Sequence, residues 1–235
     1  MIEYKLMDAR KIKTQTNYSV ISNLYANDFA KDFYHFEILD QMLAEMKKRK
    51  TEEERIVDLG SGHGPVIEYI LAKRQFNITA VDLSPEFCQI LYRKYKRKSV
   101  KVECTDMVEY VKNLPDNSIG AFTANYAIIH IPDEEIDLFY KNLSNKLLPK
   151  GLLMASFYEG VFKGITQEPY QKLKDPRLFF DGKLEVYLNY FTITELKERL
   201  GKAGFNILRL ESFKPQDPNN PIPENRIFLL AEKKM

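Results

Sequence analysis

Three glycines at alternate positions follow directly on a short apolar run that contains an acidic residue. The stretch 55–65 reads R-I-V-D-L-G-S-G-H-G-P. Ile56, Val57 and Leu59 are typical of a strand buried on both faces, and the glycines allow a tight turn that lies against a ligand with no Cβ in the way. Apolar residues at helical spacing follow over 66–71, so the turn ends at a helix N-terminus with free N–H groups. This pattern predicts a nucleotide-type site at the carboxyl end of a strand.

A second acidic residue, Asp82, ends the next apolar run, 78–81. It lies about 20 residues beyond the glycines, where an acid can accept hydrogen bonds from both ribose hydroxyls. The spacing G-x-G-x-G differs from the dinucleotide fingerprint G-x-G-x-x-G, because the third glycine comes one residue early and Pro65 follows it. A dehydrogenase is therefore disfavoured. The alternative that the glycines and Asp82 only form turns remains open.

These motifs resemble those of class I S-adenosyl-L-methionine-dependent methyltransferases. D-L-G-S-G-H-G-P and V-D-L-S-P-E-F look like the first two motifs of that family. The resemblance continues through T-D-M, A-N-Y-A-I-I-H-I-P, L-L-P-K-G-L-L and A-G-F, and it covers residues 50–233. The N-terminal Y-S-V-I-S-N-L-Y resembles the Y-D-x-x-A-x-x-Y lead-in of small-molecule members, with Ser19 in place of the usual Asp.

The resemblance implies S-adenosyl-L-methionine as cofactor and S-adenosyl-L-homocysteine as its product. It implies that the glycine turn holds the methionine part, Asp82 the ribose, and Asp106 the adenine amino group. Asp106 could instead cap the short helix that follows it, and both roles are compatible. The residues expected to bind the cofactor are Asp58, Gly60, Ser61, Gly62, Gly64, Asp82, Leu83, Asp106, Met107, Asn125 and Tyr126. His63, in the glycine turn, is expected to be a loop histidine near solvent.

His130 is the one candidate general base in the region where the methyl group transfers, because a near-neutral pKa suits proton removal. The alternative is a packed or helix-capping histidine. The same stretch lacks the D/N-P-P-Y/F motif of amino-methyltransferases of nucleic acids and the Pro-Cys of pyrimidine C5 enzymes. His35, His63 and His130 show no ligand spacing, so no metal site is predicted.

Aromatic residues on both sides of the predicted transfer region are expected to form the acceptor pocket. They come from an N-terminal helix and from the aromatic-rich stretch 158–191, whose glycines and prolines interrupt the strand–helix alternation. Long connections of this kind often serve as lids or binding loops. The alternative is that these rings are the core of a cap. The residues predicted to line the pocket are Tyr18, Tyr25, Tyr158 and Tyr190.

Regular alternation of strand and helix patterns predicts a parallel sheet with helices on both faces. Residues 1–16 are expected to be loose or to lie over the sheet, and helices are expected over 17–25 and 33–50. With the resemblance, the fold class is α/β, a Rossmann-like doubly wound sheet of seven strands in the order 3-2-1-4-5-7-6 with strand 7 antiparallel. The predicted strands are 55–59, 77–82, 100–104, 119–124, 152–157, 205–213 and 226–231.

We expect one methyltransferase domain over residues 1–235. Its parts are an N-terminal helical cap (1–50), a cofactor-binding half (51–157), an insert or lid (158–191), and a C-terminal helix and hairpin (192–235). A chain of 235 residues is long enough for one such domain with a full core.

The composition bounds the partners. The net charge is +2, so no overall electrostatic attraction to nucleic acid or anionic membrane is expected. Two cysteines are too few for a disulfide framework, and neither a signal peptide nor a membrane span is apparent, which predicts a cytoplasmic protein. The predicted function is methyl transfer to a small-molecule acceptor, by a monomer or homodimer. The alternatives are an RNA or protein methyltransferase, or a non-catalytic cofactor-binding protein of this fold. The acceptor and the methylated atom (O, N or C) are not specified by the sequence.

Overall fold

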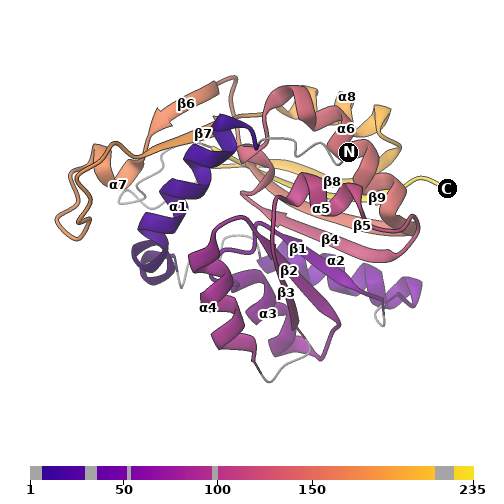
Figure 1. Ribbon diagram of the computed structural model, residues 1–235. Coiled ribbons are helices and arrows are strands. Elements are labelled where there is room, and N and C mark those ends of the chain that lie inside the picture. Colours follow the sequence, from indigo (N-terminus) through magenta and orange to yellow (C-terminus); the bar gives the residue numbers. More distant parts are fainter. Residues whose placement is uncertain (1–6, 30–35, 52–53, 97–99, 215–224) are drawn as a thin grey trace, which may run out of the picture.

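The computed structural model describes residues 7–29, 36–51, 54–96, 100–214 and 225–235 (Figure 1). The predicted helix start at 33 and the proline-rich loop 215–223 lie outside the described residues, as does His35. Among the described helices, none combines the length and the apolar character needed to cross a bilayer.

Seven strands form one sheet in the order β3-β2-β1-β4-β5-β9-β8. The first five strands in this order pair in parallel, and β9 is antiparallel to both β5 and β8. The predicted strand order is therefore confirmed, with β8 and β9 as the sixth and seventh strands. The strands are β1 (Ile56–Leu59), β2 (Ile78–Asp82), β3 (Val100–Cys104), β4 (Ile119–Asn125), β5 (Leu147–Tyr158), β8 (Phe205–Phe213) and β9 (Arg226–Lys233).

Helices cover both faces of this sheet (Figure 1). One face packs against α2 (Phe36–Arg49), α3 (Pro65–Lys73) and α4 (Pro85–Tyr95). The other packs against α5 (Met107–Lys112), α6 (Asp133–Lys146) and α8 (Ile193–Lys202). Successive strand residues point to opposite faces, so Ile56 joins the first core and Val57 the second. This double burial explains why the strands read as near-continuous apolar runs.

Local sequence signals place the helix starts. The Ser84 hydroxyl accepts a hydrogen bond from the Phe87 N–H at 3.3 Å, and Pro85 occupies the first helical position of α4. Thr192 accepts from the Glu195 N–H at 3.1 Å and caps α8. Each of the parallel strands β1, β2, β3 and β4 is followed by a turn or a helix, and these connections begin at the same edge of the sheet.

The N-terminal helix is longer than predicted. It runs over α1 (Ala9–Asp28), and the Asp8 side chain accepts from the Arg10 N–H at its start. Of the two alternatives predicted for residues 1–16, loose or lying over the sheet, a loose segment is wrong from residue 9 onward, where the chain is helical. No clear apolar stripe marks this segment, because charged and polar side chains, Lys11 and Asn17 among them, occupy its buried face. Tertiary contacts rather than a local pattern order it.

The stretch between β5 and α8 contains regular structure. It forms β6 (Lys163–Gln167), the short helix α7 (Pro169–Lys172) and β7 (Glu185–Asn189), and β6 and β7 pair as a separate antiparallel sheet. Helix α1 packs against β7, so the two segments lie side by side beyond the main sheet (Figure 1).

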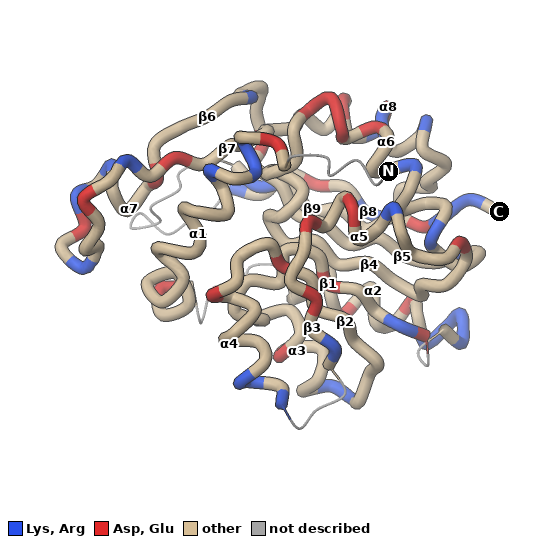
Figure 2. Tube along the Cα trace, in the orientation of Figure 1, with Lys and Arg blue, Asp and Glu red and all other residues tan. Residues whose placement is uncertain are grey.

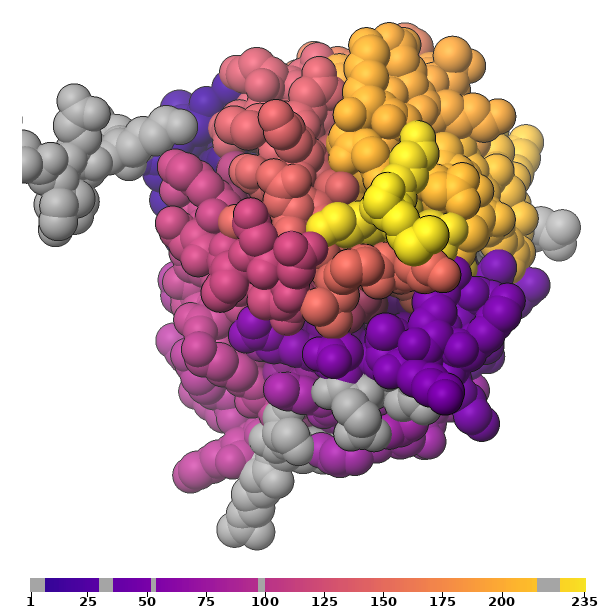
Figure 3. Space-filling view, turned by 90° about the vertical axis from the view of Figure 1, so that its right-hand side faces the viewer, coloured from indigo at the N-terminus to yellow at the C-terminus, as the bar shows by residue number. Residues whose placement is uncertain are grey.

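The C-terminal hairpin closes the other end of the molecule. Figure 3 shows α8 and the β8–β9 hairpin together on one flank, with the last residues at the surface beside α2. Strand β5 begins at Leu147 rather than at 152, because its pairing with β4 is shifted at a bulge and continues through the expected turn.

Candidate functional site

The glycine turn after β1 has a backbone that only glycine adopts easily. Gly60, Gly62 and Gly64 have φ angles of 65°, 54° and 85°. A Cβ on Gly60 would lie 2.5 Å from the Ala127 Cβ, whereas a Cβ on Gly62 would meet nothing within 4 Å. The turn therefore packs closely against the end of β4 on one side and leaves its tip open, as a backbone that cradles a ligand requires.

Asp82 at the end of β2 is tied to this turn. Its carboxylate accepts from the Gly62 N–H at 2.7 Å and from the Ser84 N–H at 2.8 Å. Burial raises the pKa of Asp82 to about 6, against the lowering effect of these backbone hydrogen bonds. The acid thus fixes the distance between the glycine turn and the start of α4.

Three of the residues expected to bind the cofactor lie outside the pocket lining. Asp58 is buried and accepts from the Thr123 hydroxyl at 2.6 Å, and burial raises its pKa to about 7. The Ser61 hydroxyl donates to the Asp58 carbonyl at 2.8 Å. Gly64 caps α3, where a Cβ would approach the Tyr95 hydroxyl to 2.9 Å. These three residues therefore support the conformation of the glycine turn from outside the pocket lining.

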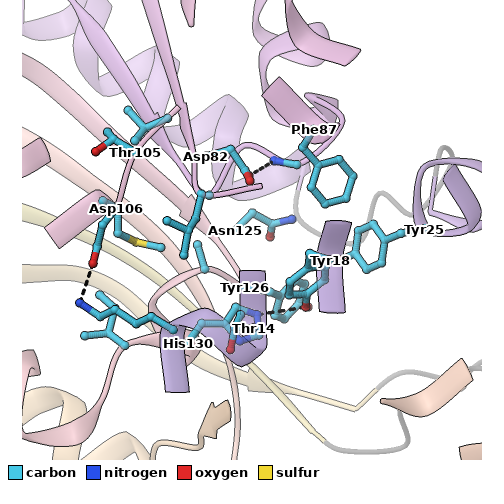
Figure 4. Close-up of a pocket in the computed structure, with 18 residues that line it drawn as sticks. Thr14, Tyr18, Tyr25, Asp82, Phe87, Thr105, Asp106, Asn125, Tyr126 and His130 are labelled. Atoms are coloured by element: carbon cyan, nitrogen blue, oxygen red, sulfur yellow. Dashed lines mark hydrogen bonds and ion pairs between the residues drawn. The ribbon is translucent and has the colours of Figure 1, made fainter. Parts of the chain in front are cut away.

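The remaining eight meet around one pocket of about 100 Å³, into which α1 also projects (Figure 4). Two lining residues outside the quoted motifs, Lys11 and Thr14, were missed by sequence reasoning. Five further lining residues lie in those motifs but were not singled out, namely Val81, Phe87, Thr105, Ala127 and Ile131. The predicted residues in the lining are Gly60, Gly62, Asp82, Leu83, Asp106, Met107, Asn125 and Tyr126.

The end of β4 is held in an unusual conformation. Tyr126 has a φ of 49°, which a non-glycine residue seldom adopts. Its N–H donates to the Ser156 hydroxyl at 2.9 Å, and that hydroxyl donates to the Asn125 side chain at 2.5 Å. This hydrogen-bonded link to β5 holds Tyr126 in its strained conformation, with the ring at the pocket. Strained backbone of this kind is common at functional sites.

The Asp106 carboxylate accepts hydrogen bonds from two different parts of the chain. One carboxylate oxygen accepts from the Val108 N–H at 2.8 Å and caps α5, as one of the two readings predicted. The other accepts from Lys11 Nζ at 2.7 Å, and Lys11 also donates to Glu135 at 2.7 Å. Although burial lowers the pKa of Lys11, these two carboxylates raise it overall. The buried ammonium therefore pins α1 across the pocket.

His130 and Tyr18 form a hydrogen-bonded pair at the pocket wall opposite Asp82 (Figure 4). His130 Nδ1 lies 2.9 Å from the Tyr187 carbonyl, which can only accept, so this nitrogen carries the proton. Nε2 then accepts from the Tyr18 hydroxyl at 3.0 Å. Burial lowers the pKa of His130 to about 4, and burial also raises the pKa of Tyr18. Both groups are neutral near pH 7, and the unprotonated Nε2 of His130 already accepts a hydrogen bond from Tyr18.

A second, larger cavity of about 580 Å³ lies between α1 and the β6–α7–β7 insert. Tyr18 and Tyr25 line both it and the first pocket, so the two spaces share a wall. Tyr158 and Tyr190 line the larger cavity, with ring centroids 5.5 Å apart. The four tyrosines predicted to form an acceptor pocket therefore do lie around one cavity.

Glu168 is one of the lining residues of this cavity that sequence reasoning missed. Its side chain is buried and accepts from the Asn17 side-chain amide and from the Tyr170 N–H. Burial raises its pKa, against the lowering effect of these two donors. An isolated glutamate between a strand and a proline gives no sequence signal of burial.

His63 does not lie near solvent as predicted. It is 7% exposed, neither ring nitrogen has a hydrogen-bond partner, and burial lowers its pKa to about 4. Helix α4 covers the turn that carries it, because the Lys94 ammonium donates to the His63 carbonyl at 3.3 Å. Within the part of the chain that the structure describes, no three His, Cys, Asp or Glu side chains gather as metal ligands.

Comparison with known proteins agrees with this geometry. Residues 56–151 match the family described as methyltransferase domain. The chain is 21% identical over 170 residues to the carboxy-S-adenosyl-L-methionine synthase of Shewanella denitrificans, which covers 66% of this chain and 70% of that protein.

Two solved structures share the fold. The complex of DhpI with SAH superposes with a TM-score of 0.66 at 16% identity, over 96% of this chain and 97% of that one. The 1,6-didemethyltoxoflavin-N1-methyltransferase of Burkholderia thailandensis, with bound 1,6-didemethyltoxoflavin and S-adenosylhomocysteine, superposes with a TM-score of 0.57 at 16% identity, over 94% and 91%.

Sheet order, glycine turn and family match define the class of this protein. Residues 56–151 match the methyltransferase domain family, and the strand order is that of the class I methyltransferase fold, whose enzymes use S-adenosyl-L-methionine. The open tip of the glycine turn and the acid at the end of β2 fit that group.

Proposed function

We propose that this protein is a single-domain enzyme that transfers a methyl group from S-adenosyl-L-methionine to a small molecule. The observation that carries the proposal is the shared wall: Tyr18 and Tyr25 line both the pocket at the glycine turn and the larger cavity under the insert, so the two spaces adjoin at these rings. A donor bound on one side and an acceptor on the other would meet at this wall. When bound, the cofactor supplies a methyl group already activated on a sulfonium and leaves as S-adenosyl-L-homocysteine.

The residues of the chain act by holding and orienting. Backbone groups of Gly60 and Gly62 hold the amino-acid end, Asp82 the ribose, and Leu83 and Met107 the adenine. Alignment of donor and acceptor is worth on the order of 7–11 kcal/mol at best, so little further side-chain chemistry is required. His130, neutral and already accepting from Tyr18, orients that ring and does not act as a strong base.

Two observations favour a small acceptor over RNA or protein. The larger cavity is enclosed by α1 and the insert and has the size of a small-molecule site. In the view of Figure 2, Lys and Arg are interspersed with Asp and Glu along the described trace. Among the fold neighbours, the toxoflavin enzyme is named for a small-molecule acceptor. The cytoplasmic location and the state of association remain predictions of the sequence alone.

One relative points to a second candidate. A carboxy-S-adenosyl-L-methionine synthase is named for making a modified form of the cofactor rather than for methylating an acceptor. Such a reaction would use the first pocket without transferring the methyl group. Protein incubated with methyl-labelled S-adenosyl-L-methionine separates the two: label moves to a new molecule in the first case and stays on the sulfonium in the second.

The direct test begins with binding. Calorimetry should show that the protein takes up S-adenosyl-L-homocysteine, and a pool of small-molecule acceptors should then release it from S-adenosyl-L-methionine. Uptake without turnover by any pool would favour a non-catalytic binding protein. No uptake at about millimolar concentration, a free energy of only about 4 kcal/mol, would refute the proposal.

A further inference from the structure

The larger cavity holds a buried acid that no cation in the described part of the chain neutralises. Glu168 is 4% exposed and lines the cavity, yet its partners there are the neutral Asn17 amide and the Tyr170 N–H. A buried carboxylate without a cation is costly, and burial raises its pKa accordingly. A ligand that brings positive charge would remove that cost.

The neighbour of this acid also needs a donor. Asn17 is buried, its amide nitrogen donates to Glu168, and its Oδ1 has no hydrogen-bond partner. Asn17 is not among the residues that line the cavity, so the buried acceptors that a ligand there can reach are the carboxylate oxygens of Glu168. Groups bearing N–H bonds would satisfy them, whereas a carboxylate or phosphate would not.

The positive charges that line the cavity do not reach this acid. Arg177 is held by Asp28 and Asp175 at 2.8 and 2.7 Å, so two carboxylates offset one guanidinium. Lys172 is exposed at the outer end of α7. With Glu168, the ionisable side chains that line the cavity comprise three acids and two bases. The balance favours a cation over an anion.

The rest of the wall is aromatic. Tyr18, Tyr25, Tyr158, Tyr170 and Tyr190 line the cavity. Faces of aromatic rings attract cations, and cages of such rings are a common way to bind substituted ammonium groups. Arg226 already lies 4.7 Å from the Tyr158 ring centroid, which shows that these rings accept a cationic neighbour.

We propose that the acceptor is a small organic amine with an apolar body, and that Glu168 is the residue that selects it. The inference rests on the proposed function, because it assigns the larger cavity to the acceptor. The ammonium or N–H donors pair with the Glu168 carboxylate, and the apolar body lies against the tyrosine rings. An ammonium that is itself to be methylated first passes one proton to this carboxylate, which frees its lone pair for the transfer. Alcohols or carboxylates of the same skeleton lack either the charge or the donors that this wall requires.

The test uses full-length protein saturated with S-adenosyl-L-homocysteine, whose uptake is measured first. A panel of aryl- and alkylamines, with the alcohol and the carboxylate of each skeleton, is then titrated by calorimetry at pH 7.5. At least one amine should bind more tightly than its alcohol and carboxylate. Glu168→Gln should weaken that amine by about tenfold or more and leave the alcohol unchanged, since a charge-assisted hydrogen bond is lost. The exposed Glu198→Gln should change neither.

A second variant guards against a folding defect. Tyr190→Leu keeps apolar volume but removes a ring face, so it should weaken the amine several-fold more than the alcohol. Melting temperature and cofactor-product affinity of each variant should match the parent. The proposal is overturned if no amine binds at up to about 10 mM, if the carboxylates bind as well as the amines, or if Glu168→Gln leaves amine binding unchanged. Failure of S-adenosyl-L-homocysteine itself to bind refutes the proposed function instead.

Discussion

The two halves of the site are built in different ways. The cofactor pocket lies where the ends of adjacent strands meet, and its predicted residues come from short motifs that each follow a strand. The larger cavity, which we propose for the acceptor, lies between α1 and the β6–α7–β7 insert, segments that are far apart in the sequence. The first is narrow, about 100 Å³, and the second about 580 Å³. Local turns therefore fix donor geometry, while long-range packing sets the room for an acceptor.

The largest expected effect is a pH-dependent change in folding stability, caused by buried Asp58 beside the cofactor pocket. Burial raises the pKa of Asp58 from 3.8 to about 7, so the folded state holds a proton that the unfolded chain releases. This contribution to stability is fully present below pH 3.8 and is lost as pH rises through about 7. Asp58→Asn stays neutral, so the parent should lose up to about 4 kcal/mol relative to the variant between pH 4 and pH 8.

Chemical denaturation at several pH values measures this difference. Asp82, whose pKa is also raised, and His63 and His130, whose pKa values are lowered, contribute their own slopes. Comparison of parent with variant cancels these. Parallel stability curves for the two proteins would show that Asp58 is ionised in the fold and that the cofactor side is less tightly packed than described.

The next effect separates the two regions directly. Asp82→Ala removes the acceptor of the Gly62 and Ser84 N–H groups and the predicted ribose partner. Affinity for S-adenosyl-L-homocysteine should fall by about 100-fold, because several charge-assisted hydrogen bonds are lost. Calorimetry gives the value, and Asp116→Ala, at an exposed acid paired with Lys146, is the control. Unchanged affinity would show that Asp82 does not contribute to cofactor binding.

The contact between the two regions is tested at Lys11. Lys11→Met leaves the carboxylates of Asp106 and Glu135 without their shared cation. We expect a loss of about 2 kcal/mol of stability, since breaking a buried ion pair strands its partners. Dissociation of S-adenosyl-L-homocysteine, followed by stopped flow, should become several-fold faster as α1 loosens. A variant that melts and releases ligand like the parent would mean that α1 is held elsewhere.

The smallest expected effect lies at the shared wall. Tyr18→Phe removes the hydroxyl that donates to His130 Nε2. This hydrogen bond favours the neutral imidazole, so the pKa of His130 should rise slightly above about 4, while burial, the main cause of its lowering, remains. The stability cost should be about 1 kcal/mol. Proton NMR titration of the histidine reports the shift, and Tyr92→Phe at an exposed tyrosine provides the comparison.

Sequence reasoning placed residues correctly at the pocket where their position follows from the end of a strand. Gly60, Gly62 and Asp82 were found because the turn backbone and the strand end fix their surroundings. It failed at His63, placed near solvent but covered by α4, and at residues 9–16, which are helical. Neither error could be avoided from local pattern, because what covers a loop or orders a polar helix is a partner distant in the chain.

The amino-acid sequence by itself determined the strands, the glycine turn and the acids at the strand ends, because backbone geometry and burial act over a few neighbouring residues; the strand order was implied by the family resemblance. Only the tertiary structure decided that Lys11 closes the pocket, that Tyr18 meets His130, and that Glu168 lies in a cavity without a cation. Those pairings join residues 95 to 151 positions apart. The energies of these pairings arise from desolvation and contact in the folded state. Local sequence patterns do not predict them, because the partners are distant in the chain.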